Sequence, residues 1–381
     1  MRTVDLKVKD VAFGGKGVGR DKGKAVFIPF TIDGERVSAK IVREKKQFAE
    51  AELVDLVEVS PHRVQPPCPY FGRCGGCSYQ HIDYEHQLAL KFRQVRNVLR
   101  RLGKLADVPM RPIIPSPSSY RYRNRITVHA QDGVVGFFRR ESHRLIDIET
   151  CPIARPEVND ALVDLRRGRV RDGHYTLRAG PGPRVFSQAN DAVADALRDL
   201  VAQLIPSGQE LLVDAYCGAG FFAKTLLEKF ERIIGIDWDK FAIEAARENA
   251  MEKERYIVGN VDVELVRLLH ADAGEAAVSA AGSGDLRVRT RTTTAKTTLI
   301  VDPPASGLSA GTRRVIVDLA PATLIYVSCN PATLARDLKE LSDKFKIESV
   351  TPLDMFPQTA EIEVVASASL PMRTERKAHP T

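Results

Sequence analysis

Strand-like and helix-like segments alternate along this 381-residue chain from about residue 185 to its end. A helical period over 189–204 precedes the apolar run 211–214, a glycine-containing turn and a second apolar run over 233–237. Such alternation predicts parallel strands, which bury their apolar side chains only when helices cover both faces of the sheet. We therefore predict an α/β, doubly wound domain, with a helix directly after the glycine turn.

Several residues of this domain lie where doubly wound folds bind ligands. Gly218 and Gly220 let the backbone approach a ligand, and Asp237 ends the second strand, where its carboxylate can accept hydrogen bonds from ribose hydroxyls. The third glycine of a dinucleotide fingerprint is missing, so S-adenosylmethionine fits better than NAD. Asp237 could instead cap the next helix. Asn260 is expected near the adenine, at the end of the third strand.

Two later strands end in side chains suited to catalysis. Asp302 precedes paired prolines, which cannot continue a central strand. Cys329 follows the run 324–327 and lies in a polar turn, which makes it the candidate nucleophile. Cys217, inside the glycine turn, is predicted to serve only in packing.

A thiolate beside S-adenosylmethionine suggests methylation of carbon 5 of a pyrimidine. Addition of a thiolate at carbon 6 makes carbon 5 nucleophilic, and a base must later remove the carbon 5 proton. Glu361 and Glu363 are both available near the last strands. Because they are two residues apart, we expect them on one strand face, and the spacing does not choose between them.

The first 60 residues alternate apolar and polar positions in short runs, with glycines in the turns at 14–17 and 33–34. This pattern predicts a small β-barrel of the oligonucleotide-binding type, or another small β-barrel. Residues 61–180 combine a helix over 84–102 with further strand-like runs. We therefore predict three domains, over 1–60, 61–180 and 181–381, with the alternative that the 84–102 helix packs on the last of these. Residues 271–298 lack a period and are predicted to form a surface insertion.

Basic residues predict a polyanionic partner. The net charge is +7, and ten Lys or Arg stand against the single acid Asp107 between Lys91 and Arg125. The first half of this segment could be a solvated helix face, but 120–125 interleaves Tyr with Arg, as proteins that bind single-stranded RNA do. No apolar run has the length of a signal peptide or membrane span. We expect a cytoplasmic monomer that binds RNA and no membrane.

Four cysteines predict a structural metal site. Cys68, Cys74 and Cys77 are separated by five and then two residues, and Cys151 can supply a fourth thiolate. In a reducing cytosol such cysteines are ligands more often than disulfides. Zinc accepts four thiolates, although this spacing differs from the paired two-residue gaps of zinc ribbons.

Motifs along nearly the whole chain resemble one known family. The chain is similar to the S-adenosylmethionine-dependent RNA 5-methyluridine methyltransferases, in the iron–sulfur branch that begins with a TRAM barrel. The segments that carry this similarity are 14–18, 74–77 and 186–190, and it continues to the last motif, which contains Glu363. The resemblance implies a Rossmann-like methyltransferase domain after a central, β-rich iron–sulfur domain. It implies methylation of a specific uridine in structured ribosomal or transfer RNA through a covalent adduct. It also implies a 4Fe–4S cluster on the four cysteines.

The resemblance assigns roles to single residues. Cys329 matches the nucleophile and Glu363 the proton-removing base. The positions that contact the cofactor match Gln188, Tyr216, Asp237, Asn260 and Asp302. The chain departs from the family at Ala305, where Arg is usual, and at Gln358, where His is usual.

Two other functions remain open at this point. An RNA cytosine carbon-5 methyltransferase uses similar chemistry but usually needs a second cysteine. The other is a non-catalytic RNA-binding iron–sulfur protein. For an enzyme that must flip its target base, a loop is the expected target, because flipping costs least where the base is already unstacked.

Overall fold

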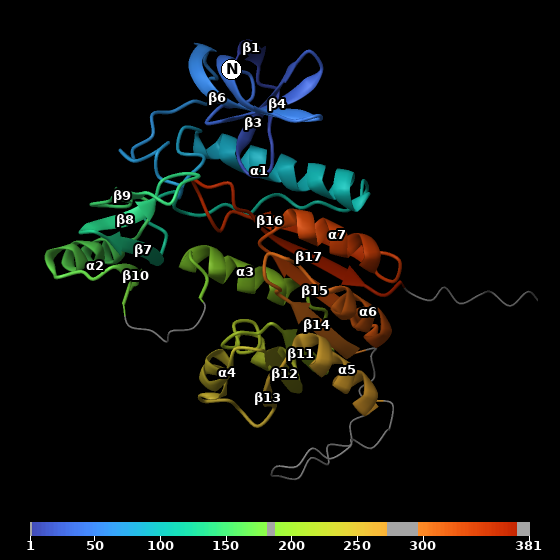
Figure 1. Ribbon diagram of the computed structural model, residues 1–381. Helices are drawn as coiled ribbons and strands as arrows, with labels where there is room; N and C mark the ends of the chain where they lie inside the picture. The colour runs from blue at the N-terminus through green and yellow to red at the C-terminus, as the bar shows by residue number, and fades with distance from the viewer. Residues whose placement is uncertain (1, 181–186, 273–295, 372–381) are drawn as a thin grey trace, which may run out of the picture.

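The computed structural model describes residues 2–180, 187–272 and 296–371. These residues form three sheets, of six, four and seven strands. Figure 1 shows the first sheet at one end of the molecule, the second at its side and the third in the largest part, with the long helix α1 between the first and the third. Within the described ranges, none of the helices has the length and apolarity needed to cross a bilayer.

The N-terminal sheet alternates buried and exposed residues, as the sequence predicts. Its order is β1-β5-β6-β4-β3-β2. On β5, the second strand in this order, Val37, Ala39 and Ile41 face the core. The predicted turn at 14–15 has φ values of 92° and 87°, which glycine adopts without strain. The strands are β1 (Thr3–Lys7), β2 (Asp10–Val11), β3 (Lys16–Asp21), β4 (Lys24–Pro29), β5 (Arg36–Glu44) and β6 (Phe48–Glu58).

The central sheet is antiparallel, in the order β10-β7-β8-β9. One of its faces is closed by the helix α2 (Pro156–Arg167), whose Val158 and Leu162 pack on Val128 and Ile148. The strand-like runs predicted between 120 and 180 are therefore confirmed. The strands are β7 (Arg125–Gln131), β8 (Val134–Phe138), β9 (Leu145–Asp147) and β10 (Gly173–Arg178).

The helix predicted over 84–102 is present as α1 (Tyr84–Val98), followed by the π-helical turn η1 (Leu99–Gly103). Its Val95 and Leu99 belong to the core of the third sheet. Farther along, Ile114 pairs with Leu353, the last residue of β16 (Lys346–Leu353). The stretch from 84 to 114 therefore packs on the C-terminal sheet, although the sequence places it in the middle domain.

The C-terminal sheet has the order β13-β12-β11-β14-β15-β17-β16. Its first five strands are parallel, and β17 lies antiparallel between β15 and β16. The remaining strands are β11 (Leu211–Ala215), β12 (Arg232–Asp237), β13 (Glu254–Val258), β14 (Thr297–Val301), β15 (Thr323–Ser328) and β17 (Glu363–Ser369).

Helices cover both faces of this sheet, which confirms the predicted doubly wound architecture. Leu197 and Ile243, on α3 and α4, pack on one face, and Leu265, Ile316 and Leu334, on α5, α6 and α7, pack on the other. The helices are α3 (Asp191–Leu204), α4 (Lys240–Arg247), α5 (Val261–Asp272), α6 (Ala310–Leu319) and α7 (Pro331–Leu341). The insertion predicted at 271–298 lies mostly outside the described residues.

The α-helix predicted directly after the glycine turn is wrong. Successive turns and the short 3-10 helix η2 (Leu227–Lys229) occupy that segment. The Ala223 amide donates to Asp214 Oδ2 (2.9 Å), so it is not available for a helical hydrogen bond to a carbonyl four residues earlier.

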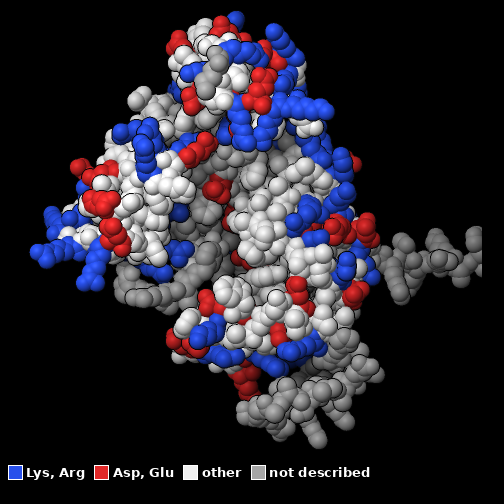
Figure 2. All heavy atoms as spheres, in the orientation of Figure 1, with Lys and Arg blue, Asp and Glu red and all other residues white. Residues whose placement is uncertain are grey.

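The three parts of the molecule surround a hollow on the face shown in Figure 2. Asp and Glu atoms are visible inside this hollow, and Lys and Arg side chains gather at several points around it. The carboxyl ends of the parallel strands, where doubly wound folds hold their ligands, carry the acidic residues described next.

Candidate active site and cysteine cavity

Strand register brings the predicted nucleophile and base together. Ser328, the last residue of β15, pairs with Val364 of the antiparallel strand β17. Cys329 therefore lies one step beyond this pair, opposite Glu363, the first residue of β17. Glu363 is only 3% exposed, whereas Glu361 is exposed. The expectation that the two glutamates share a strand face is wrong, because the strand begins only at Glu363.

Burial and mutual repulsion raise the pKa values of the acidic groups at this site. The pKa of the Cys329 thiol is raised to about 11, first by burial and then by the negative charges of Glu363 and Asp302. Burial and the neighbouring Asp237 raise the pKa of Asp302 to about 7. Burial and Asp302 raise the pKa of Glu363 well above its usual range. A cation bound among these groups would favour their ionised forms.

Asn330 joins the loop that carries Cys329 to the loop that follows Asp302. Its Nδ2 donates to the Ala305 carbonyl (3.1 Å), and Thr333 Oγ1 donates to the same oxygen (3.2 Å). Its Oδ1 accepts the Ala332 amide and so caps α7. Sequence reasoning missed this role, although Asn followed by Pro is a typical start of a helix.

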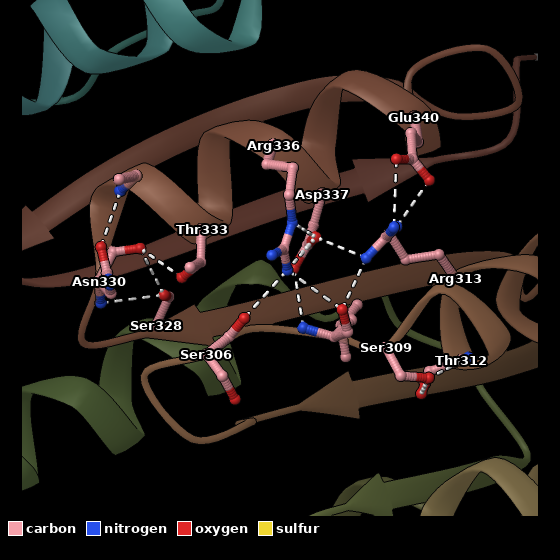
Figure 3. A network of polar contacts seen from close by, with 12 residues as sticks. Ser306, Ser309, Thr312, Arg313, Ser328, Asn330, Thr333, Arg336, Asp337 and Glu340 are labelled. Carbon is pink, nitrogen blue, oxygen red and sulfur yellow. Dashed lines mark hydrogen bonds and ion pairs between the residues drawn. The ribbon is translucent and has the colours of Figure 1, made fainter.

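A second polar network, centred on Asp337, fixes the same loops (Figure 3). This fully buried carboxylate accepts from the Tyr326 hydroxyl (2.7 Å) and the Leu308 amide (2.8 Å). Arg336 Nε (2.8 Å) and Arg313 Nη1 (3.0 Å) supply the compensating charge. The network was missed because its members come from three elements whose contact no local pattern reveals.

Asp237 ties the glycine turn to the end of β12. One carboxylate oxygen accepts the Gly218 amide (2.9 Å), and the other accepts the Asp239 amide (2.9 Å). The helix cap of α4 is Asp239, so the alternative that Asp237 caps this helix is wrong. Each carboxylate oxygen keeps a lone pair for a ligand hydroxyl.

A cavity of about 250 Å³ lies between the glycine turn and the start of α3. Gln188, Tyr216, Gly218 and Asp302 line it together, so the structure brings these predicted cofactor residues to one place. Tyr216 has a φ of 65°, a conformation that costs a residue with a side chain about 1–3 kcal/mol and is concentrated at functional sites.

The remaining predicted cofactor residues lie outside this lining. Gly220 follows in the same turn with a φ of 85°. Asn260 is exposed, and its Oδ1 accepts the Asp262 amide (2.8 Å) at the start of α5. Its contact with adenine stays a prediction. Cys217 is buried in the core, as expected for a packing residue.

The four predicted ligands Cys68, Cys74, Cys77 and Cys151 line one cavity of about 490 Å³. Among the described side chains, however, no three Cys, His, Asp or Glu are arranged to hold a metal ion. All six cysteines are free thiols. Asn159 of α2, missed from the sequence, accepts the Cys151 amide (2.8 Å) and donates to its carbonyl (3.1 Å), so it is a positioning residue.

Among the basic and Tyr residues of the predicted RNA-binding segment between Lys91 and Arg125, two are buried, whereas six of its cations, among them Arg96 and Arg121, are exposed. Lys91 is fully buried, and its Nζ lies 2.6 Å from Asp354 Oδ1. Tyr122 is also buried, and its hydroxyl donates to the Pro357 carbonyl (2.9 Å). Both residues join their segment to the C-terminal domain, and the buried Tyr122 ring cannot stack on an RNA base. Arg123 lines the cysteine cavity.

Gln358, one of the departures from the resembled family, is built into the same domain contact. It is buried, with Oε1 accepting from Gln87 Nε2 (3.0 Å) and its own amide donating to Gln87 Oε1 (3.1 Å). Its carbonyl accepts the amides of Ser78 and Tyr79, which follow the cysteine loop. At this position the chain thus uses an amide side chain for anchoring.

Comparison with known proteins shows the family of this chain. The family described as tRNA (Uracil-5-)-methyltransferase matches residues 166–367, and the TRAM domain matches residues 1–54. These two matches cover the C-terminal sheet and nearly all of the N-terminal sheet.

Relatives match over almost the full length. An uncharacterized RNA methyltransferase of Bdellovibrio bacteriovorus is 32% identical over 95% of this chain and 94% of its own. Another from Halalkalibacterium halodurans is 28% identical over 96% and 97%. The solved Pyrococcus abyssi tRNA (uracil-54, C5)-methyltransferase with S-adenosyl-L-homocysteine shares the fold, with a TM-score of 0.67 and 24% identity over 96% of this chain and all of the other. The chain therefore belongs to the tRNA (uracil-5-)-methyltransferase family and carries a TRAM domain at its N-terminal end.

Proposed function

We propose that this protein, an RNA uracil-5 methyltransferase by family, methylates one uridine in a loop of transfer or ribosomal RNA through a covalent bond to Cys329. The observation that carries this proposal is the position of Cys329 opposite the buried Glu363, beside Asp302, at the ligand-binding edge of the sheet. An S-adenosylmethionine-dependent enzyme of this family needs a nucleophile and a base at one place, and these residues meet that need.

The roles of the residues follow from their chemistry. The Cys329 thiolate adds to carbon 6 of the uracil, and the displaced electron pair makes carbon 5 an enolate carbon. Bound S-adenosylmethionine supplies the methyl group. Glu363 then accepts the carbon 5 proton, the electron pair restores the carbon 5–carbon 6 double bond, and the sulfur leaves as thiolate. Its raised pKa makes ionised Glu363 a stronger proton acceptor than an exposed glutamate.

The cofactor is proposed to lie along the glycine turn. Asp237 is placed to accept the ribose hydroxyls, because its carboxylate already borders the Gly218 amide. Gln188, Tyr216 and Asp302 would surround the reactive end in the 250 Å³ cavity. A sulfonium there would meet the acidic cluster, which favours a cation.

Transfer of labelled methyl groups tests the proposal. Total RNA from a strain lacking the gene, incubated with protein and labelled S-adenosylmethionine, should gain 5-methyluridine at one mapped site. Cys329→Ala should abolish the transfer, and RNA containing 5-fluorouridine should crosslink to Cys329. Incorporation into cytosine, or undiminished transfer by Cys329→Ala, would contradict the proposal.

Two alternatives are weakened by the structure. A cytosine enzyme that relies on a second cysteine would have to use Cys217, whose thiol is buried and has its pKa raised first by burial and then by Asp214. A non-catalytic RNA-binding protein would not require a thiol facing a buried carboxyl across two strands.

We also propose that Cys68, Cys74, Cys77 and Cys151 hold a 4Fe–4S cluster. The proposal is supported by the position of the four cysteines, which all line one cavity of about 490 Å³. Their five-then-two spacing also differs from the paired two-residue gaps of zinc ribbons. Protein purified without oxygen should contain about four iron and four sulfide per chain. Stoichiometric zinc without sulfide would overturn the assignment.

The six free thiols fit a reducing compartment, and we propose that the protein acts in the cytoplasm. We propose further that it acts as a monomer. Sedimentation of the purified protein at a mass near 42.1 kDa would support this.

A further inference from the structure

A third cavity, open to solvent and of about 700 Å³, lies on the central domain beside the cysteine loop. We call it the ring pocket. Its walls come from the end of the cysteine loop, from β7, from the end of β8 and from the turn that joins β8 to β9. Its lining includes His129, Phe138, Arg139, Arg140, Glu141 and His143.

Three rings stand next to one another in this pocket. The ring centroids of His129 and Phe138 are 4.3 Å apart at an interplanar angle of 37°, and His143 lies edge-on to Phe138 at 6.1 Å. His129 occupies the face of β7 that points away from the core, because its neighbours Val128 and Ala130 are buried. The Phe138 ring is 36% exposed, so it offers an apolar surface to solvent.

Gly136 pairs with His129 across the strands and lies very close to β9, because a Cβ added to it would be 1.9 Å from the Ile146 carbonyl. The His129 and Phe138 rings, in contact on β7 and β8, form the aromatic surface of the pocket. The arrangement is a platform on which a flat, aromatic ligand can stack.

The charges around the rings favour a phosphate. Arg139 is exposed, and within the described part of the chain its guanidinium has no hydrogen bond or ion pair. Arg140 lies over the Phe30 ring at 4.9 Å and 3.9 Å from Glu141. Glu141 is 73% exposed and also lies 3.8 Å from Lys16. Lys16 pairs more closely with Glu50 (3.2 Å), so among the described cations of this surface Arg139 is the one left to meet a phosphate.

The ring pocket connects with the active site through a few residues. Ser78, which lines the pocket, donates its amide to the Gln358 carbonyl (3.0 Å). The N-terminal domain packs against the same two segments, because a Cβ added to Gly15 would lie 3.2 Å from both Ser78 and Ala360. From there the chain runs through Glu361 to the base Glu363.

We propose that the ring pocket binds one unpaired nucleotide of the RNA substrate, a short distance along the strand from the methylated uridine. The base stacks on Phe138 and His129, and the adjoining phosphate pairs with Arg139. This inference rests on the proposed function for its RNA ligand. Stacked rings beside a guanidinium are the combination that recognises unpaired nucleotides, whereas a duplex hides its base faces.

Fluorescence anisotropy tests this site. The two probes are a labelled single-stranded RNA 20-mer of mixed sequence and the duplex of the same sequence. Phe138→Leu should lower affinity for the single strand about tenfold or more and leave duplex binding within about twofold, because stacking contributes on the order of 1–3 kcal/mol per base. Phe138→Tyr, which keeps a ring, should bind like the wild type. Arg139→Gln should weaken single-strand binding and reduce its dependence on salt.

Arg167→Gln is the matched control, because Arg167 is an exposed arginine of the same domain that pairs only with Asp164 (3.6 Å) and lies outside the pocket. Single-strand binding by Phe138→Leu equal to that of the wild type would overturn the inference, as would an equal loss for the single strand and the duplex. Wild-type crosslinking of 5-fluorouridine RNA at Cys329 in the same preparations keeps the two proposals apart. If that crosslink forms and Phe138→Leu binds normally, the ring pocket fails while the proposed function stands.

Discussion

Cys329 lies opposite Glu363 at the first position beyond the pairing of β15 with β17. The antiparallel strand β17 makes this possible, because it enters the sheet beside β15 and brings the start of one strand to the end of the other. A nucleophile and a base that act in succession on neighbouring carbons of one ring need this closeness.

Replacing the base should separate methyl transfer from release. In Glu363→Gln the adduct can form but its carbon 5 proton has no acceptor, so turnover should fall by about 100-fold or more. The RNA–protein adduct should persist in denaturing gels. Glu361→Gln, which changes an exposed carboxyl two residues away, is the control and should turn over normally. Rapid turnover by Glu363→Gln would remove Glu363 from its role.

The reactivity of Cys329 should rise steeply with pH. Since the pKa of this thiol is raised to about 11, the thiolate fraction should grow about tenfold per pH unit between pH 7 and 10. Alkylation by iodoacetamide, followed by peptide mass spectrometry, measures this. In Asp302→Asn a charge that raises the pKa is lost, so alkylation at pH 8 should be roughly threefold faster or more, while methyl transfer falls. A slower alkylation in that variant would contradict the electrostatic account.

Charge on the cofactor should activate the thiol. S-adenosylmethionine and S-adenosylhomocysteine have almost the same shape, but only the first carries a sulfonium. At saturation and pH 8, Cys329 should therefore be alkylated faster with the first than with the second, because a nearby cation lowers the pKa of a thiol. Equal rates with the two would show that the sulfonium does not act on Cys329.

The ion pair between Lys91 and Asp354 should matter for stability, since both side chains are fully buried. Lys91→Met leaves an unpaired buried carboxyl and should lower the free energy of unfolding in urea by about 3–5 kcal/mol. Adding Asp354→Leu should restore part of that loss. Lys344→Met, at an exposed position, should change stability by less than about 0.5 kcal/mol. A Lys91→Met protein as stable as the wild type would contradict a structural role.

Asn330 should affect catalysis by holding the loop that carries Cys329 against the loop that follows Asp302. Asn330→Asp keeps the acceptor that caps α7 but loses the donor to the Ala305 carbonyl, so stability should hold while kcat falls by about tenfold. Asn330→Ala loses both and should also be destabilised by about 1 kcal/mol. Melting temperature and kcat, measured on both variants, separate the two functions. Unchanged kcat in Asn330→Asp would show that the tie between the loops is dispensable.

The regular elements could be predicted because their signals are local. The period of α3 and the alternation in β5 follow from side chains that are neighbours in the sequence. The helix predicted after Gly220 failed because Asp214, nine residues before Ala223, takes the amide that a helix would use. Periodicity does not reveal this competition, because it depends on where the Asp214 side chain points at the end of β11.

The site was predicted in part for the same reason. Cys329 and Asp302 follow apolar strands, and parallel strands end at one edge, so their meeting follows from the fold. Tyr122 had the composition of an RNA-binding residue but is buried against Pro357, a contact between segments more than 200 residues apart. The choice between Glu361 and Glu363 likewise depended on where β17 begins.

The Gln358 carbonyl, which accepts the amides of Ser78 and Tyr79, couples two distant parts of the fold. It joins the chain that follows Cys77 to the chain that leads into Glu363. A change in the order of the cysteine loop is therefore expected to reach Glu363 as well, with Cys329 and Asp302 left in place.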